Sequence, residues 1–360
     1  MHRRNTGQWI GRGYNFLRRN QVLLLGMATV VVLGGCVKPE DPYRERTDLL
    51  LTQLDQINTR GYARYTDVVD TLMFVAASQA GGQIWVQRDG SWTLQYEHSF
   101  STAELEIVRY DAQNRLWLAA DRRSGYVLPM DSTHLAPDPV YSLQQFSDSN
   151  TEDFVFDSKP DSVELWLADS DGSDGLKYFT FSRGTDPFGL PAWEITSGEK
   201  IKVSAYTGMD RQGQRVGLAR SELGIEVFDL PVAAGSLPFA TADTPGEALD
   251  VTFYENQLLV ADNWAGMTTF VLADSVLTQA GLLEVDGWVK HIDLWEDYAF
   301  LSCAGNGLFV VKLSADATGQ VVDQFVPISY VYDVTIVGDV LYVASREGVL
   351  IYKIERNPNG

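Results

Sequence analysis

Aspartate residues recur at one point of a pattern that repeats along this sequence, and their carboxylates are well suited to binding chemistry. This point is where the first apolar strand of each repeat begins. The residues at the seven equivalent positions are Asp67, Arg109, Asp153, Gly208, Asp250, Asp293 and Asp333. If the repeats close into a ring, five carboxylates and one guanidinium surround a common opening. Such a ring could bind a cation, a water cluster or a basic side chain, because converging like charges oppose each other's ionisation. The alternative that we favour is that each aspartate caps a turn or bonds the backbone of the neighbouring repeat.

A second group of side chains stands where the second strand of each repeat ends, and it would reach the same opening. Asp262 and Trp264 lie there in the loop "DNWAG". The indole of Trp264 could stack on a sugar or on a side chain of a protein partner. It could equally pack against the next repeat.

The run "DSDGSDG" brings the alternating carboxylates of Asp169, Asp171 and Asp174 close together, as oxygen ligands of calcium require. It departs from the EF-hand pattern, because glycine stands at its fourth place and Thr180 replaces the glutamate at its twelfth. A solvated acidic turn is therefore the favoured interpretation, with a calcium site as the alternative. The sequence implies no other cofactor.

Catalytic motifs are weakly represented. His98, His134 and His291 lie in different repeats without metal-ligand spacing. The sequence contains no glycine-flanked serine elbow, P-loop or dinucleotide fingerprint. A non-catalytic protein is the favoured interpretation, although paired carboxylates could still serve a glycosidase.

The elements that would position these residues are seven copies of one unit, each with apolar strands, a polar turn and a glycine loop. The loop glycines are Gly82, Gly125, Gly175, Gly224, Gly266, Gly307 and Gly348. A unit of about 42 residues supplies four short antiparallel strands, the size of a propeller blade. We therefore predict an all-β fold, a seven-bladed β-propeller of four-stranded antiparallel blades over residues 61–356. The glycines are expected at tight turns with positive φ.

The last unit ends after its third strand, so its fourth strand has to come from elsewhere. The segment around Leu49 to Asn58 is the available donor, and pairing the two ends of the chain would close the ring. A helix in that segment is an equally good local interpretation. Residues 36–60 are predicted to be a linker that could contribute this closing strand.

The first 35 residues have the pattern of an export signal. Five arginines precede the apolar run "VLLLGMATVVVL", which is too short to span a bilayer as a mature helix. The following "LGGC" resembles a lipobox, which implies cleavage after residue 35 and lipidation of Cys36. We therefore expect a lipoprotein that is held on a bacterial membrane through Cys36, with the outer membrane favoured by Val37.

The repeats resemble LVIVD repeats, a family of bacterial propeller repeats. The resemblance rests on "LDVTFYENQLLVADNWAGMTTFVL", "HIDLWEDYAFLSCAGNGLFVVKL", "YDVTIVGDVLYVASREGVLIYKI" and "RVGLARSELGIEVFDLP", and it covers about residues 63–355. It implies a propeller fold and an exported location, and no catalytic residues.

Charge narrows the range of partners. The chain has a net charge of −20, and without residues 1–35 it has 23 basic against 48 acidic residues. Nucleic acid is therefore excluded as a partner, because its phosphates need a basic surface. The favoured function is a cell-envelope lipoprotein whose propeller face binds a protein or a glycan. The alternatives are an outer-membrane assembly factor of the propeller type and a carbohydrate-active enzyme.

Overall fold

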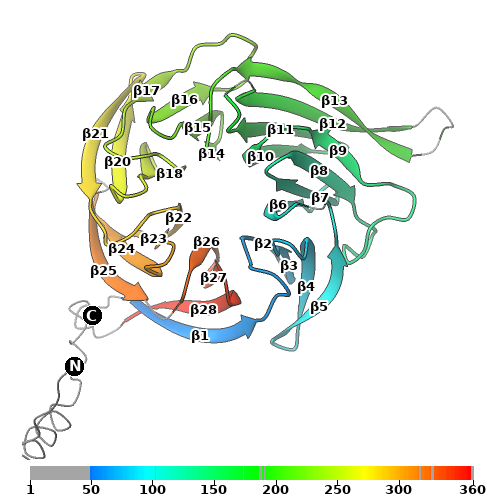
Figure 1. Cartoon of the computed structure of the whole chain (residues 1–360), viewed down its shortest axis with the longest axis horizontal. Helices are drawn as coiled ribbons and strands as arrows, with labels where there is room; N and C mark the ends of the chain where they lie inside the picture. The colour runs from blue at the N-terminus through cyan, green and yellow to red at the C-terminus, as the bar shows by residue number, and fades with distance from the viewer. Residues whose placement is uncertain are drawn as a thin grey trace, which may run out of the picture. The chain divides into compact units, whose positions relative to one another are not determined.

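Seven separate sheets make up the folded part of the chain. The computed structural model describes residues 49–101, 103–172, 174–185, 189, 191–315, 318–325 and 328–357. These residues contain seven antiparallel sheets of four strands each. The sheets are arranged radially around a centre (Figure 1), which confirms the predicted seven-bladed β-propeller.

Six of the blades are built from consecutive strands, which we call A to D from the centre outward. Blade 1 contains β2 (Tyr65–Val69), β3 (Leu72–Ala76), β4 (Gly82–Arg88) and β5 (Ser91–His98). Blade 2 contains β6 (Leu105–Asp111), β7 (Leu116–Asp121), β8 (Ser124–Pro129) and β9 (Gln144–Ser147). Blade 3 contains β10 (Thr151–Lys159), β11 (Ser162–Asp169), β12 (Leu176–Thr185) and β13 (Pro191–Lys202).

The next three blades follow the same order. Blade 4 contains β14 (Gly208–Gln212), β15 (Arg215–Ala219), β16 (Ile225–Asp229) and β17 (Ala240–Ala242). Blade 5 contains β18 (Asp250–Tyr254), β19 (Gln257–Ala261), β20 (Met267–Ala273) and β21 (Val276–Leu283). Blade 6 contains β22 (His291–Trp295), β23 (Tyr298–Ser302), β24 (Leu308–Leu313) and β25 (Gly319–Phe325).

Blade 7 combines both ends of the folded chain. It contains β26 (Val331–Val337), β27 (Val340–Ser345) and β28 (Gly348–Arg356), with β1 (Leu49–Ile57) as its outermost strand. β1 pairs antiparallel with β28 from Leu49 opposite Arg356 to Ile57 opposite Val349 (Figure 1). The segment proposed as the strand donor is thus a strand and not a helix. Leu49 and Ile57 are buried, so this strand also joins the core.

The core consists of seven hydrophobic clusters, and each lies between two neighbouring blades. Between blades 1 and 2, the ring of Phe74 stacks on Tyr110 with centroids 4.2 Å apart and touches the buried Trp117. Burial of one such side chain stabilises a fold by about 1.5–3 kcal/mol. Because every cluster needs two blades, stability depends on closure of the ring.

The two faces of the propeller differ in which loops they carry. Alternation of the strands puts the B–C loop of each blade on the same face as the D–A connection to the next blade. Backbone bridges join these segments, as between Asn263 and Val289 or between Ala304 and Val331. We call this the B–C face, and the opposite one, with the A–B and C–D turns, the A–B face. Strand A begins and strand B ends at the B–C face, as the sequence analysis expected.

The loop glycines serve two purposes rather than one. Five of them have positive φ, as at Gly266 with φ of 96°. Gly82 and Gly125 do not have positive φ, so the expectation was wrong there. A Cβ at Gly125 would lie 2.4 Å from Cε2 of Phe146, which shows that close packing against an aromatic ring requires this glycine.

The predicted export signal and Cys36 lie outside the described residues. Within the described part of the chain, no helix has the length and apolar character needed to cross a bilayer.

Candidate functional site

The predicted ring of charged residues does surround the centre, but it forms two layers rather than one. Inward-facing positions on strand A are two residues apart. The first layer, nearer the B–C face, contains Tyr65, Asp153, Asp250, His291 and Asp333. The second layer contains Asp67, Arg109, Asp210 and Asp293. The sequence alignment merged these layers by placing Asp67, Arg109 and Asp293 with Asp250. Gly208 does align with Asp250, and the carboxylate of blade 4 lies two residues later, at Asp210.

Three carboxylates of the second layer clamp the next blade in the same way. Each accepts a hydrogen bond from a backbone N–H on strand A of the following blade. The three pairs are Asp67 with Tyr110 N at 2.5 Å, Asp210 with Phe253 N at 2.8 Å, and Asp293 with Ile336 N at 2.6 Å. The three bonds join blades 1 to 2, 4 to 5, and 6 to 7.

Two carboxylates of the first layer join further pairs of blades. Asp153 Oδ2 accepts a hydrogen bond from Met209 N at 3.1 Å, across blades 3 and 4. Asp333 Oδ2 lies 3.5 Å from Thr66 N, across blades 7 and 1. Five aspartates of the two layers therefore contact the backbone of the neighbouring blade, which is the interpretation favoured from the sequence.

Three ion pairs, made by Arg109 and His291, complete the circle. The Arg109 guanidinium lies 3.1 Å from Asp153 Oδ1 and joins blade 2 to blade 3. The imidazole of His291 joins blade 6 to both neighbours, with Nδ1 2.6 Å from Asp250 Oδ2 and Nε2 3.2 Å from Asp333 Oδ1. Each of the seven blade boundaries thus has a polar link at the centre. We call this set of residues the polar ring.

Burial in the polar ring shifts its titrations. Desolvation raises the pKa of Asp333 to about 7 and that of Asp293 to about 6. Desolvation opposes the charged form of His291, yet the carboxylates of Asp250 and Asp333 outweigh it and raise the pKa of His291 to about 10. The imidazole is therefore a cation at neutral pH.

The polar ring holds the blades together. Arg109 and Asp210 line a cavity of about 370 Å³ near blades 2 to 4, whereas the carboxylates of blades 5 and 7 are closed to a ligand. The side chains of Asp250 and Asp333 are 6% and 4% exposed. Sequence reasoning missed Tyr65, Asp210 and His291, although the two-residue period of a strand places His291 on the same face as Asp293. Asp210 lies two residues beyond Gly208 by the same rule.

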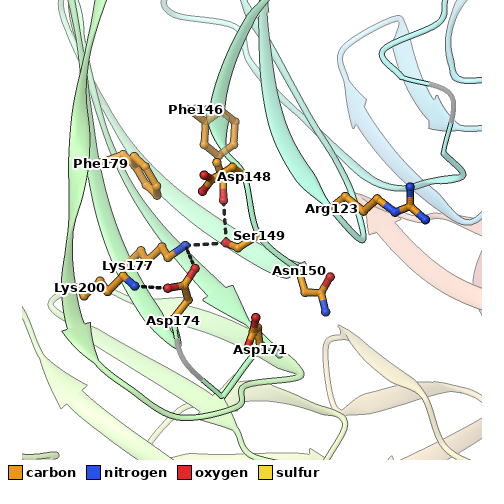
Figure 2. Close-up of a pocket in the computed structure, with 11 residues that line it drawn as sticks. Arg123, Phe146, Asp148, Ser149, Asn150, Asp171, Asp174, Lys177, Phe179 and Lys200 are labelled. Atoms are coloured by element: carbon orange, nitrogen blue, oxygen red, sulfur yellow. Dashed lines mark hydrogen bonds and ion pairs between the residues drawn. The ribbon is translucent and has the colours of Figure 1, made fainter.

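The acidic turn for which calcium was the alternative is paired with lysine side chains. Lys177 Nζ lies 2.6 Å from Asp174 Oδ2 and 3.6 Å from Asp169 Oδ2, and Lys200 also pairs with Asp174 (Figure 2). Asp169 Oδ1 accepts a hydrogen bond from the backbone N–H of Asp171 at 2.7 Å. Among the described residues, no three His, Cys, Asp or Glu side chains come together as metal ligands. Calcium would have to displace two ammonium groups to bind here.

Three cavities lie at equivalent places on the B–C face. Each is lined by the B–C loop of one blade, the connection that follows that blade, and the B–C loop of the next. The cavities have volumes of about 510 Å³ between blades 1 and 2, 700 Å³ between blades 2 and 3, and 590 Å³ between blades 5 and 6. The B–C face is therefore hollowed at several blade boundaries.

The three cavities differ in chemistry. Arg64 and Glu104 form an ion pair of 2.9 Å in the first. Lys177, Lys200 and Asp174 lie together in the second, which Figure 2 shows. The third is lined by Trp264, Trp288 and Tyr330, and we call it the tryptophan groove.

Trp264 lies in the tryptophan groove and not in the polar ring. It is 62% exposed. Asp262 is fully buried beneath the same loop, where it accepts hydrogen bonds from Thr268 Oγ1 at 2.8 Å and Gly246 N at 3.1 Å. Asp262 thus positions the loop that displays Trp264. Trp288 is 60% exposed and was missed by the sequence analysis.

Comparison with known proteins shows the fold alone. No family model and no curated protein matches the sequence. A chain of the mitotic checkpoint complex is similar with a TM-score of 0.63 and 11% identity, covering 84% of this chain and 95% of that one. The WD40 β-propeller domain of Doa1 has a TM-score of 0.60, 10% identity and coverage of 86% and 98%. The computationally designed Ika8 protein has a TM-score of 0.56, 11% identity and coverage of 84% and 99%.

Proposed function

We propose that this protein is a lipid-anchored binding protein of the bacterial cell envelope, which presents the B–C face of its propeller to a protein or glycan partner. The observation that carries the binding role is the set of three cavities on one face, two of them charged and one aromatic. Binding sites are typically concave, with a few polar groups among apolar ones. The acidic central residues have a separate task, because they join the blades.

The anchor rests on the sequence pattern around Cys36. Cells that produce the protein would be grown with a labelled fatty acid, and the wild type compared with Cys36→Ser. We expect label on the wild type alone, and release of the variant from the membrane fraction. Label on Cys36→Ser would contradict the anchor without affecting the binding role.

The binding role is tested by affinity purification of the full-length protein from detergent-solubilised envelope. Trp264→Ala and Trp288→Ala change the B–C face, whereas Leu237→Ala changes an 87% exposed residue in the C–D connection on the opposite face. We expect the B–C variants to lose a partner that Leu237→Ala retains. Barrel-assembly components among the partners would indicate an assembly factor. Equal recovery with all variants would contradict the binding face.

A carbohydrate-active enzyme has weaker support. Asp250 is buried and paired with His291, and Asp293 bonds the backbone of blade 7. Both carboxylates are thus engaged in the polar ring. Glycan hydrolysis that is lost in Asp250→Asn or Asp293→Asn would nevertheless argue for an enzyme.

A further inference from the structure

We propose that the tryptophan groove binds a lysine or arginine side chain of a partner protein. This inference rests on the proposed binding function and names the chemistry of the partner. The groove has a volume of about 590 Å³, and Trp264, Asp286, Trp288, Asn306 and Tyr330 are among the residues that line it.

Backbone bridges fix the main chain next to the groove's aromatic residues. Val289 N donates a hydrogen bond to Asn263 O at 3.0 Å, so Trp264 and Trp288 each lie one residue from the two ends of the same bridge. Val331 N donates to Ala304 O at 3.0 Å, beside Tyr330. A ligand would therefore meet a surface whose backbone is already arranged, which reduces the entropy cost of binding.

The two indoles of this groove have no cation over them, whereas its Tyr330 ring and the neighbouring Tyr332 ring each have one. Arg346 lies 4.7 Å from the Tyr330 ring centroid, and Arg64 lies 4.4 Å from that of Tyr332. In the described part of the chain, no arginine or lysine lies over the indole of Trp264 or Trp288. Tryptophan attracts cations more strongly than tyrosine or phenylalanine.

Charge favours a cationic occupant over a neutral or anionic one. Asp286 is exposed, and among the described residues that line the groove it is the one Asp, Glu, Lys, Arg or His. The chain as a whole has a net charge of −20, so a basic partner is also attracted from a distance. Tryptophan and tyrosine contribute much of the binding energy at protein interfaces. Another exposed apolar side chain on the same face is Leu223, in the B–C loop of blade 4, which is 61% exposed.

The test is isothermal titration of the full-length protein in detergent with a peptide of alternating arginine and glycine. A matched peptide carries citrulline in place of arginine, which keeps the shape and removes the charge. We expect the citrulline peptide, Trp264→Ala and Trp288→Ala each to weaken binding by about ten-fold, as loss of a desolvated cation–π contact would. Asp286→Asn should weaken it several-fold, and Leu237→Ala should leave it unchanged.

Several outcomes would overturn this assignment. Equal affinity of the wild type and both tryptophan variants for the arginine peptide would mean that general acidic charge accounts for binding. Titration with maltohexaose and chitohexaose separates a sugar site. Tryptophan-dependent binding of either sugar without binding of the arginine peptide would overturn the cation assignment but leave the proposed binding face intact. Failure of the proposed binding face is a separate result, because it would give equal recovery of partners with all variants in the affinity purification.

Discussion

The imidazole of His291 lies 2.6 Å from the carboxylate of Asp250, across the boundary between blades 5 and 6. The pair belongs to a circle of polar contacts that joins every blade to the next at the centre. The apolar faces of the blades pack against each other without a fixed direction. The circle of polar contacts fixes the rotation of one blade relative to the next. Acidic residues at the centre of this propeller are thus explained by assembly.

The pH profile of stability should reveal the charge on His291. Its pKa is about 10 in the folded protein against 6.5 in the unfolded chain, so the folded state holds the extra proton between these values. Stability from this group is complete below pH 6.5 and is lost as the pH rises to 10. Thermal unfolding of the wild type should show this loss. His291→Gln should be less stable by about 3 kcal/mol at pH 6.5, with a flatter profile to pH 10. Parallel profiles would contradict the ion pair.

Asp333 should make stability depend on pH over a second, more acidic range. Its pKa is raised from 3.8 to about 7, so stability falls as the pH rises through this interval and the buried carboxyl must ionise. Asp333→Asn removes that titration. The melting temperature of Asp333→Asn, relative to the wild type, should therefore increase from pH 4 to pH 7. A constant difference over that range would argue against a buried, desolvated carboxyl.

Breaking the link between blades 2 and 3 should be costly. Arg109→Met leaves Asp153, with a side chain 10% exposed, without its guanidinium partner. We expect a loss of about 3 kcal/mol in the free energy of unfolding by denaturant. The exposed pair of Arg215 and Asp229 is the control, and Arg215→Met should cost under about 1 kcal/mol. Similar losses in the two variants would show that the Arg109–Asp153 pair contributes no more to the free energy of unfolding than an exposed ion pair.

Millimolar calcium should leave the melting temperature unchanged. Lys177 and Lys200 already neutralise Asp174, and a side chain as buried as that of Lys177 does not yield its place readily. Lys177→Met should lower stability by about 3 kcal/mol, because the buried Asp169 loses its ammonium partner and Asp174 retains only Lys200. A rise in the wild-type melting temperature on adding calcium would instead support the metal site.

Gly125→Ala tests the role of glycine in close packing. Its Cβ would meet the Phe146 ring, and such overpacking costs about 1–3 kcal/mol. Gly213→Ala is a useful comparison, because that position has φ of 60° and nothing within 4 Å, so strain alone acts there at about 1 kcal/mol. Denaturant unfolding should show a larger loss of stability for Gly125→Ala than for Gly213→Ala. A neutral Gly125→Ala would mean that the ring moves aside freely.

The repeat pattern was enough to predict the number of blades and the face on which their loops gather, because both follow from periodicity. The register of strand A was harder to predict. Irregular pairing before Asp153 and before Asp333 shifts the count of residues, and the A–B turn of blade 2 is longer than that of blade 1. Exposure of Trp288 depends on the path of the connection between blades 5 and 6, which no local pattern specifies.

Site-specific photocrosslinking in living cells tests the central claim most directly. A photoreactive residue would replace Glu222 or Leu223 on the B–C face, and Leu237 or Val276 on the A–B face, all of which are exposed. We expect a defined crosslinked species from the B–C positions and none from the A–B positions. Crosslinks confined to Leu237 and Val276 would contradict the assignment of the binding face.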